Sequence, residues 1–175
     1  MFKKILVALD RSEHSEQIFA EVLDLAGRQG AALLLVHVLS GDEEMSPGQP
    51  EPPLTEYYPF IVDDESYNYF HRQWEHYRRQ GLDMLNRRVE EARATGLSAE
   101  CAQTAGNAGS RICALARSWG ADLIVTGRRG RTGLGELLLG STSNYVLHHA
   151  PCAVLVLNVA AVPAAPQRTV QSTVS

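Results

Sequence analysis

Hydrophobic and polar positions alternate in blocks along the chain, and these blocks predict strands that are separated by helices. Three short stretches are largely apolar without alternation, as expected for strands that are buried on both faces: residues 5–9, 32–39 and 122–126. A further apolar strand is expected over residues 153–157. A weaker strand is expected over residues 97–104. The pattern therefore predicts five strands, most of them central in a sheet.

The segments between these strands carry apolar residues at helical spacing. Ile18, Val22 and Leu25 follow this spacing within a helix expected over residues 12–28. Three further helices are expected from about residue 65 up to Gly96, over residues 107–119 and over residues 141–149. In the long second helix, residues 70, 74 and 77 form one apolar row and residues 82, 85, 89 and 92 another, with an expected kink at Gly81 between them.

The alternation of strands and helices indicates an α/β protein. We expect a doubly wound, five-stranded parallel sheet of order 3-2-1-4-5 with helices on both faces, as in Rossmann-like folds. Residues 1–158 are expected to form a single domain. Within it, residues 40–64 form a proline-rich insert loop, and residues 159–175 are expected to be a flexible tail. The tyrosines 57, 58, 67 and 69 of this region would form a lid or partner contact, or would pack over the sheet edge.

Composition and charge exclude several function classes. The net charge of −4 and pI near 5.8 argue against a general nucleic-acid binder. No apolar stretch approaches the roughly 20 residues of a membrane helix, and the apolar run near the N-terminus is too short for a signal peptide. Cys101, Cys113 and Cys152 form neither a CxxC pair nor a disulfide framework. We therefore expect a cytoplasmic protein without a metal site, whose cysteines are small buried side chains.

Glycines, arginines and hydroxyl groups gather in the stretch 126–146, TGRRGRTGLGELLLGSTSNYV. The glycines at 127, 130, 133 and 135 allow the backbone to approach a ligand closely, and Gly140 opens a helix whose first turn has unpaired N–H groups. Ser141 and Ser143 add hydroxyl donors. This combination predicts a phosphate site. The arginines at 128, 129 and 131 would neutralise phosphate charge or would simply be solvated. The spacing is neither that of a P-loop nor that of the dinucleotide motif GxGxxG.

Other candidate ligand contacts follow from the expected strand order, which reverses between the first and fourth strands. Ligands bind at the carboxyl ends of strands at such a point, which here directs attention to Asp10, Thr126 and Gly127. Asp10 would accept a hydrogen bond from a sugar hydroxyl or a base amino group, or it would begin the first helix as part of a capping box with Glu13. A flat base could lie on Val38, with hydrogen bonds to the backbone there.

The sequence resembles the universal stress protein family over about residues 1–158. The opening KKILVALDRSEHS and the closing GADLIVTGRRGRTGLGELLLGSTSNYVLHHAPCAVLVL carry the resemblance. The nucleotide motif of the family, G-x2-G-x9-G-[ST], is complete as Gly127, Gly130, Gly140 and Ser141. The chain departs from the family pattern at Arg11, Ala108 and Ala153, and in its long insert.

The resemblance implies that ATP or another adenine nucleotide binds at the switch point. By position, Asp10 would contact the ribose or base and Val38 the adenine. The other implied contacts are Gly106 near the base or ribose, Thr126 and Gly127 along the ribose-phosphate side, and Gly130, Gly140, Ser141, Thr142 and Ser143 on the phosphates. Arg128 and Arg129 are added as candidate contacts because of their charge. Any Mg²⁺ would be carried by the phosphates. The resemblance also implies a homodimer through the strand Ala153 to Leu157, which its exposed edge would favour.

Three functions are consistent with these features. The leading hypothesis is an adenine-nucleotide-binding stress regulator that acts as a dimeric signalling module and reports its occupancy to a regulatory protein partner. The second is a slow ATPase, although no base, nucleophile or carboxylate cluster stands beside the glycine loop. We therefore assign no catalytic residue. The third is a nucleotide-free dimeric interaction module, which the complete glycine motif argues against.

Overall fold

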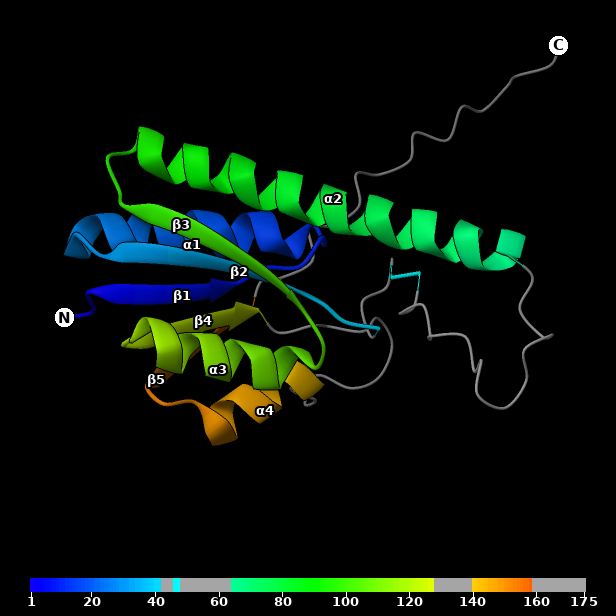
Figure 1. The fold of residues 1–175 in the computed structure, drawn as a ribbon. Coiled ribbons are helices and arrows are strands. Elements are labelled where there is room, and N and C mark those ends of the chain that lie inside the picture. Colours follow the sequence, from blue (N-terminus) through cyan, green and yellow to red (C-terminus); the bar gives the residue numbers. More distant parts are fainter. Residues whose placement is uncertain (42–45, 48–63, 128–139, 159–175) are drawn as a thin grey trace, which may run out of the picture.

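A single parallel sheet forms the centre of the molecule (Figure 1). The computed structural model describes residues 1–41, 46–47, 64–127 and 140–158. The sheet has five strands in the order β3-β2-β1-β4-β5, which confirms the predicted topology. Its strands are β1 (Lys4–Ala8), β2 (Ala32–Leu39), β3 (Ala99–Ala105), β4 (Leu123–Gly127) and β5 (Ala153–Leu157). All four neighbouring pairs are parallel.

Four helices cover the two faces of this sheet: α1 (His14–Gln29), α2 (Asp64–Ala94), α3 (Ala108–Trp119) and α4 (Ser141–His149). Helices α1 and α2 pack on one face, and α3 and α4 pack on the other (Figure 1). Side chains of one strand serve both layers, because successive residues point to opposite faces. Ile5 and Val7 lie in the core under α1 and α2, whereas Leu6 lies in the core under α3 and α4.

Helix α2 runs through Gly81, the position of the expected kink, without interruption. Gly81 is buried, and a Cβ at this position would overlap with the side chains of His37 and Gln103 on the sheet. The glycine therefore permits close packing of the helix on β2 and β3. Gly81 also takes the buried position that the sequence pattern assigned to Leu82, which is 37% exposed.

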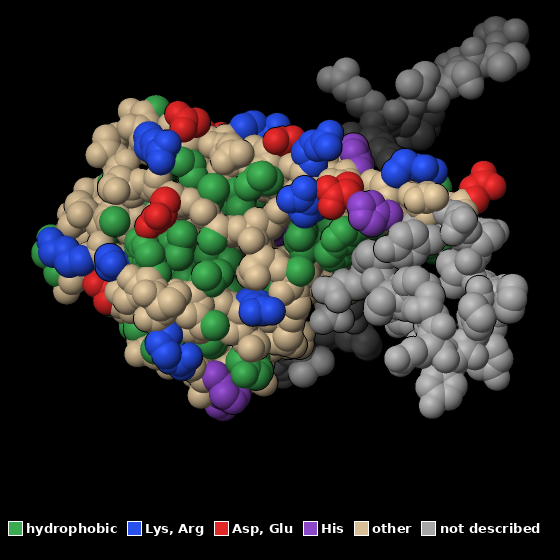
Figure 2. All heavy atoms as spheres, viewed as in Figure 1, with side chains coloured by type: hydrophobic (Ala, Val, Ile, Leu, Met, Phe, Trp, Pro, Cys, Tyr) green, Lys and Arg blue, Asp and Glu red, His purple; other side chains and the backbone are tan. Residues whose placement is uncertain are grey.

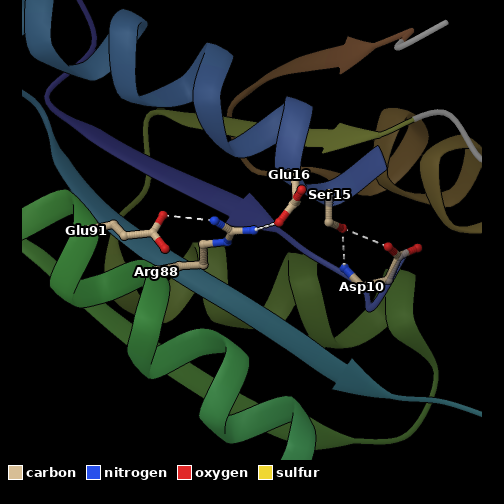
Figure 3. Close-up of polar contacts among 5 residues, drawn as sticks. All are labelled: Asp10, Ser15, Glu16, Arg88 and Glu91. Carbon is tan, nitrogen blue, oxygen red and sulfur yellow. Dashed lines mark hydrogen bonds and ion pairs between the residues drawn. The ribbon is translucent and has the colours of Figure 1, made fainter. Parts of the chain in front are cut away.

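An ion-pair cluster joins the two helices on this face (Figure 3). The guanidinium of Arg88 on α2 donates to Glu16 on α1 and to Glu91 on its own helix, both at 2.8 Å. Arg88 also lies over the ring of Phe19, 5.2 Å from its centre. The first turn of α1 is thereby held against α2, which matters because this turn follows Asp10.

The described surface carries charges of both signs. On the face shown in Figure 2, Lys and Arg groups are interspersed with Asp and Glu groups. None of the helices in the described part of the chain combines the length and apolarity needed to cross a bilayer. Most of the expected 40–64 insert and all of the tail from residue 159 onward lie outside the described residues.

Candidate functional site

Those predicted site residues that the structure describes lie at one edge of the sheet, where the parallel strands end. β1 and β4 are neighbours at the centre of the sheet, yet the helices that follow them lie on opposite faces: α1 on one and α4 on the other. The chain therefore diverges between these two strands. In open α/β sheets this divergence creates the crevice in which ligands bind.

Asp10 lies two residues beyond β1, and three donors converge on its Oδ1 atom. These are the backbone N–H of Ser12 at 3.0 Å, the hydroxyl of Ser12, and the hydroxyl of Ser15 at 2.7 Å. The backbone N–H of Asp10 in turn donates to Ser15 Oγ at 2.9 Å. The capping-box alternative is wrong, because α1 begins only at His14 and Glu13 occupies the N-cap position without a side-chain hydrogen bond.

Val38 lies near the end of β2, which extends past the end of β1. Leu9 N donates to Val36 O at 2.8 Å, so the carbonyl of Val36 faces β1. Gly106 N donates to Leu39 O at 3.1 Å, so the carbonyl of Leu39 faces β3. Because these directions alternate along a strand, the backbone groups of Val38 face the β1 side. β1 ends at Ala8, opposite Val36, so these groups face the crevice beyond the last strand pairing.

Gly106 follows β3 at the same edge, and its backbone has a φ of +128°. Residues with a side chain rarely adopt this conformation, so the chain requires glycine here. Space is also limited, because a Cβ on Gly106 would lie 3.1 Å from Arg111 Nε. That nitrogen donates to the carbonyl of Ala105 at 3.0 Å. Gly106 thus turns the chain sharply from β3 toward α3 beside Leu39.

Thr126 and Gly127 end β4 on the other side of the crevice. Thr126 is buried, and its hydroxyl lies 3.3 Å from Ser143 Oγ on α4. Ser143 is also buried and donates its proton to the carbonyl of Gly127 at 2.9 Å. The hydroxyl of Ser143 therefore ties α4 to β4, so any phosphate contact of this residue would come from its backbone N–H.

The N-terminus of α4 presents the donors expected of an anion site. Gly140 is the N-cap, with φ −57° and ψ 152°, and its carbonyl accepts a bond from Asn144 N at 2.9 Å. Ser141 is the first helical residue and therefore does not cap the helix. Ser141 is exposed and Thr142 is half-buried. Their backbone N–H groups belong to the helix turn that lacks intrahelical acceptors.

Three predicted contacts, Arg128, Arg129 and Gly130, lie outside the described residues. Nearby Arg11, one of the departures from the family pattern, holds its guanidinium over the ring of Tyr77 on α2, 5.5 Å from the centre. His37 is almost fully buried on β2 and lies 3.2 Å from Gln103 Nε2. His37 is therefore a packed residue of the strand.

We next consider metal-ligand clusters and reactive thiols in the described part of the chain. No cluster of three or more His, Cys, Asp or Glu side chains suited to a metal ion occurs there. The three cysteines are free, and only Cys113 is fully buried. Burial raises the pKa of the Cys113 thiol, partly offset by Arg117. Burial likewise raises the pKa of Cys101 and of Cys152. Raised values favour neutral thiols over nucleophilic thiolates.

Ser12 and Ser15 are the site residues that the sequence pattern did not reveal. Both lie within five residues of Asp10 and bind its Oδ1 atom. Ser15 is 5% exposed, which is unusual for a serine. The spacing D-x-S-x-x-S directly after an apolar strand could have identified them, because short polar side chains there can bond back to the aspartate.

The chain matches known proteins along most of its length. Residues 1–158 match the model of the universal stress protein family. Universal stress protein Sll1388 of Synechocystis sp. is 31% identical over 160 residues, which cover 89% of this chain and 97% of the relative. Universal stress protein YxiE of Bacillus subtilis is 33% identical over 157 residues, which cover 90% of this chain and 99% of the relative.

Solved structures share the fold. Universal stress protein UspA from Lactobacillus plantarum superposes with a TM-score of 0.68 at 22% identity, covering 89% of this chain and 97% of that chain. A family protein from Arabidopsis thaliana with AMP bound has a TM-score of 0.60 at 21% identity, covering 91% and 93%. Two others, at TM-scores of 0.55, are a universal stress protein in complex with cAMP and one from Archaeoglobus fulgidus in complex with dAMP.

Proposed function

The chain belongs to the universal stress protein family, and from this premise we propose that it binds an adenine nucleotide at the carboxyl edge of its sheet. In this proposal it acts as a cytoplasmic, dimeric regulator of the stress response, and its nucleotide occupancy is reported to a protein partner. The observation that carries the proposal is the pairing, across one crevice, of backbone groups suited to a base with a helix N-terminus suited to phosphate.

The Val38 backbone is suited to the adenine edge. Adenine presents a donor, its 6-amino group, beside an acceptor, its N1 atom. The Val38 carbonyl and N–H both face the β1 side beyond the last strand pairing. A neighbouring acceptor and donor on one strand edge can satisfy both base groups, and a backbone pair of this kind discriminates adenine from guanine, whose corresponding groups are reversed.

The N-terminus of α4 is suited to the phosphates. Its first turn offers the N–H groups of Ser141, Thr142 and Ser143, and the hydroxyl of Ser141 is exposed beside them. Helix N-termini favour anions because these N–H groups are unpaired and the helix dipole is positive there. Gly127 lies beside this helix turn, and its carbonyl is held by the hydrogen bond from Ser143. The motif residues Arg128, Arg129 and Gly130 would complete the phosphate loop.

The ligands of the structural neighbours narrow the class of nucleotide that we propose for this chain. AMP, cAMP and dAMP share adenine and a 5′-phosphoryl group but differ in the free hydroxyls of the sugar. Binding through the base and phosphate therefore suits all three, and we extend it to ATP in this chain. The described residues offer no carboxylate cluster for a metal, so Mg²⁺ would enter on the phosphates of the nucleotide, where it would neutralise part of their charge.

The dimer would form through β5. This strand is last in the sheet order, and Leu155 on it is 36% exposed. An edge strand with exposed apolar side chains readily pairs with another chain. A two-fold axis would place the same strand of the second copy beside it. The surface formed by such a dimer, together with the proline-rich insert, is where a regulatory partner would bind.

Isothermal titration calorimetry tests this proposal with ATP, ADP, AMP and GTP. We expect adenine nucleotides to bind at near-millimolar or tighter dissociation constants and GTP to bind more weakly. Gly140→Asp should weaken AMP binding at least about tenfold through charge repulsion. Asp is a good N-cap residue, and the φ of Gly140 suits any residue, so the fold should remain stable. Gly140→Ser is the matched control, since it caps the helix without adding charge.

Two results would contradict the proposal. Absence of binding by all adenine nucleotides at millimolar concentration would favour a nucleotide-free interaction module. Steady release of phosphate from ATP, present in the natural sequence and absent in Gly140→Asp, would instead favour a slow ATPase. A dimer that persists in Gly140→Asp would show that assembly and nucleotide binding use separate surfaces.

A further inference from the structure

Ser15 is a buried polar residue in the first helix turn after the crevice, and it makes two reciprocal bonds with Asp10. Its hydroxyl donates to Asp10 Oδ1 at 2.7 Å and accepts from Asp10 N at 2.9 Å (Figure 3). Only 5% of Ser15 is exposed. Because both bonds go to the same residue, they fix the side-chain rotamer of Asp10 as well as the backbone that carries it.

The turn that carries Ser15 is itself held on both sides. The next residue, Glu16, pairs with Arg88 of α2 at 2.8 Å (Figure 3). One turn later, Ile18 packs against the end of β4, so closely that a Cβ on Gly127 would overlap with its side chain. Helix α1 thus contacts both walls of the crevice: Ser15 holds Asp10 after β1, and Ile18 contacts Gly127 at the end of β4.

Within the crevice, Asp10 is the group suited to bind the sugar of the nucleotide. A carboxylate accepts hydrogen bonds, and the donors of the adenosine part of AMP are the 6-amino group and the 2′- and 3′-hydroxyls of the ribose. The carbonyl of Val38 would take the amino group, and the α4 N-terminus would take the phosphate, as argued above. A ribose hydroxyl is the remaining donor. The carboxylate would accept it best when its orientation is fixed before the nucleotide binds.

We propose that Ser15 is a positioning residue that orients the Asp10 carboxylate toward a ribose hydroxyl of the bound nucleotide. This inference rests on the proposed nucleotide binding and adds the residue by which the site recognises the sugar. Ser12 contributes to the same oxygen, but its backbone N–H would hold Asp10 Oδ1 even without its hydroxyl. The side chain of Ser15 is the contact that a substitution can remove completely.

Calorimetry with AMP, 2′-deoxy-AMP and 3′-deoxy-AMP tests the proposal. A hydrogen bond to a charged group corresponds to about tenfold in affinity or more. The natural sequence should therefore bind AMP about tenfold more tightly than the analogue that lacks the contacted hydroxyl. In Ser15→Ala this ratio should fall below about threefold, mainly because AMP binds less well. Ser15→Thr retains the hydroxyl and should keep the ratio, as should Ser118→Ala, in which the altered serine is bonded to the backbone of α3.

Three outcomes separate the possibilities. If Ser15→Ala weakens AMP and both analogues equally, Ser15 is a structural residue only and the proposal is wrong. If the natural sequence binds all three nucleotides equally, no sugar hydroxyl is recognised and the proposal is also wrong, while nucleotide binding stands. If AMP does not bind at all, the proposed nucleotide binding is wrong, and the inference that rests on it is wrong as well. Should Ser15→Ala not fold, Ser15→Cys still fills the site but replaces the hydroxyl by a weakly hydrogen-bonding thiol, and it must show the same loss of discrimination.

Discussion

Ser143 donates its hydroxyl proton to the carbonyl oxygen of Gly127, 2.9 Å away. This bond joins the first turn of α4 to the last residue of β4, and both residues belong to the predicted phosphate wall of the crevice. Ser143 is 3% exposed. The two serines of α4 therefore have different roles, since the exposed Ser141 is available to a ligand and the hydroxyl of Ser143 already has an acceptor.

Ser143→Ala should lower the free energy of unfolding by about 1–3 kcal/mol. The substitution leaves the carbonyl of Gly127 and the hydroxyl of Thr126 without their partner in a buried place. Ser141→Ala should change stability by less than about 0.5 kcal/mol, because Ser141 is exposed. Urea unfolding of both variants measures the difference.

Ser141→Ala and Ser143→Ala should also differ in their effects on nucleotide binding, and here Ser141→Ala should have the larger effect. Ser141→Ala should weaken AMP binding about tenfold if its hydroxyl donates to the phosphate. A stable Ser143→Ala with unchanged affinity, or a Ser141→Ala that is destabilised without loss of affinity, would contradict the assignment. Ser118→Ala on α3 serves as the reference for truncating an exposed serine.

The fold could be predicted because each strand and helix is marked by its own hydrophobic pattern and flanking residues. The boundaries of α4 and β5 agree with the sequence to the residue, since Gly140 and Pro151 flank the helix. The buried row of α2 was only partly predicted, because Gly81 contributes no hydrophobicity and Leu82 beside it does. A glycine that is buried for close packing cannot be recognised from periodicity.

The site was predicted in outline and not in its contacts. The glycine motif and Asp10 follow from residue types and spacing. The orientation of the Val38 backbone depends on strand register and on where β1 ends, and neither is written in local sequence. Ser15 was missed because residue type and hydrophobic periodicity do not distinguish a buried serine from an exposed one. Only its spacing from Asp10, with which it forms a hydrogen bond, carries a signal.

Gly106→Ala should destabilise the protein by about 1–2 kcal/mol or more. The φ of +128° is unfavourable for any residue with a Cβ, and Arg111 lies within 3.1 Å of the added atom. Gly27→Ala is the matched control. It lies in α1, where nothing lies within 4 Å of an added Cβ, and alanine should stabilise that helix by about 0.5–1 kcal/mol.

Thermal and urea unfolding should show changes of opposite sign in the free energy of unfolding for these two glycine variants. A Gly106→Ala variant as stable as the natural sequence would mean that the turn after β3 rearranges freely. It would also remove the reason for placing glycine beside the nucleotide. Equal destabilisation in both variants would indicate a general intolerance to added volume instead of a backbone requirement.

The thiols should react slowly and regain reactivity only on unfolding. Burial raises the pKa of Cys101, Cys113 and Cys152 above the unfolded value of about 8.5, so at pH 8 each forms less thiolate than in an unfolded chain. The three thiols should react with a disulfide reagent more slowly in buffer than in guanidinium chloride, with Cys113, 4% exposed, the slowest. A thiol that reacts at the unfolded rate would contradict this.

The same shifts give a sign for stability against pH. A pKa that is raised on folding means that the folded chain retains protons that the unfolded chain has lost. The stabilisation is therefore fully present below the unfolded thiol pKa and is lost as the pH rises through the folded one. Comparing the natural sequence with Cys113→Ala by urea unfolding at pH 7 and pH 10 isolates this contribution. The difference in stability between the two proteins should be smaller at pH 10.

Leu155→Lys should convert the expected dimer into a monomer. Leu155 is 36% exposed on β5, the edge strand of the sheet, and a two-fold axis along that edge would bring two copies of residue 155 near one another. Two lysines there would be buried without counterions, which costs several kcal/mol and should weaken dimerisation by at least about a hundredfold. Analytical ultracentrifugation over a range of concentrations measures the shift.

Leu147→Lys provides the comparison for this prediction. Leu147 is more exposed than Leu155, at 46%, but it lies on α4 and not on the edge strand β5. A dimer formed by pairing of β5 should tolerate a charge there. If Leu147→Lys dissociates the dimer and Leu155→Lys does not, assembly uses the α4 surface and the β5 proposal is wrong. If both variants remain dimeric with unchanged affinity, neither surface forms the interface.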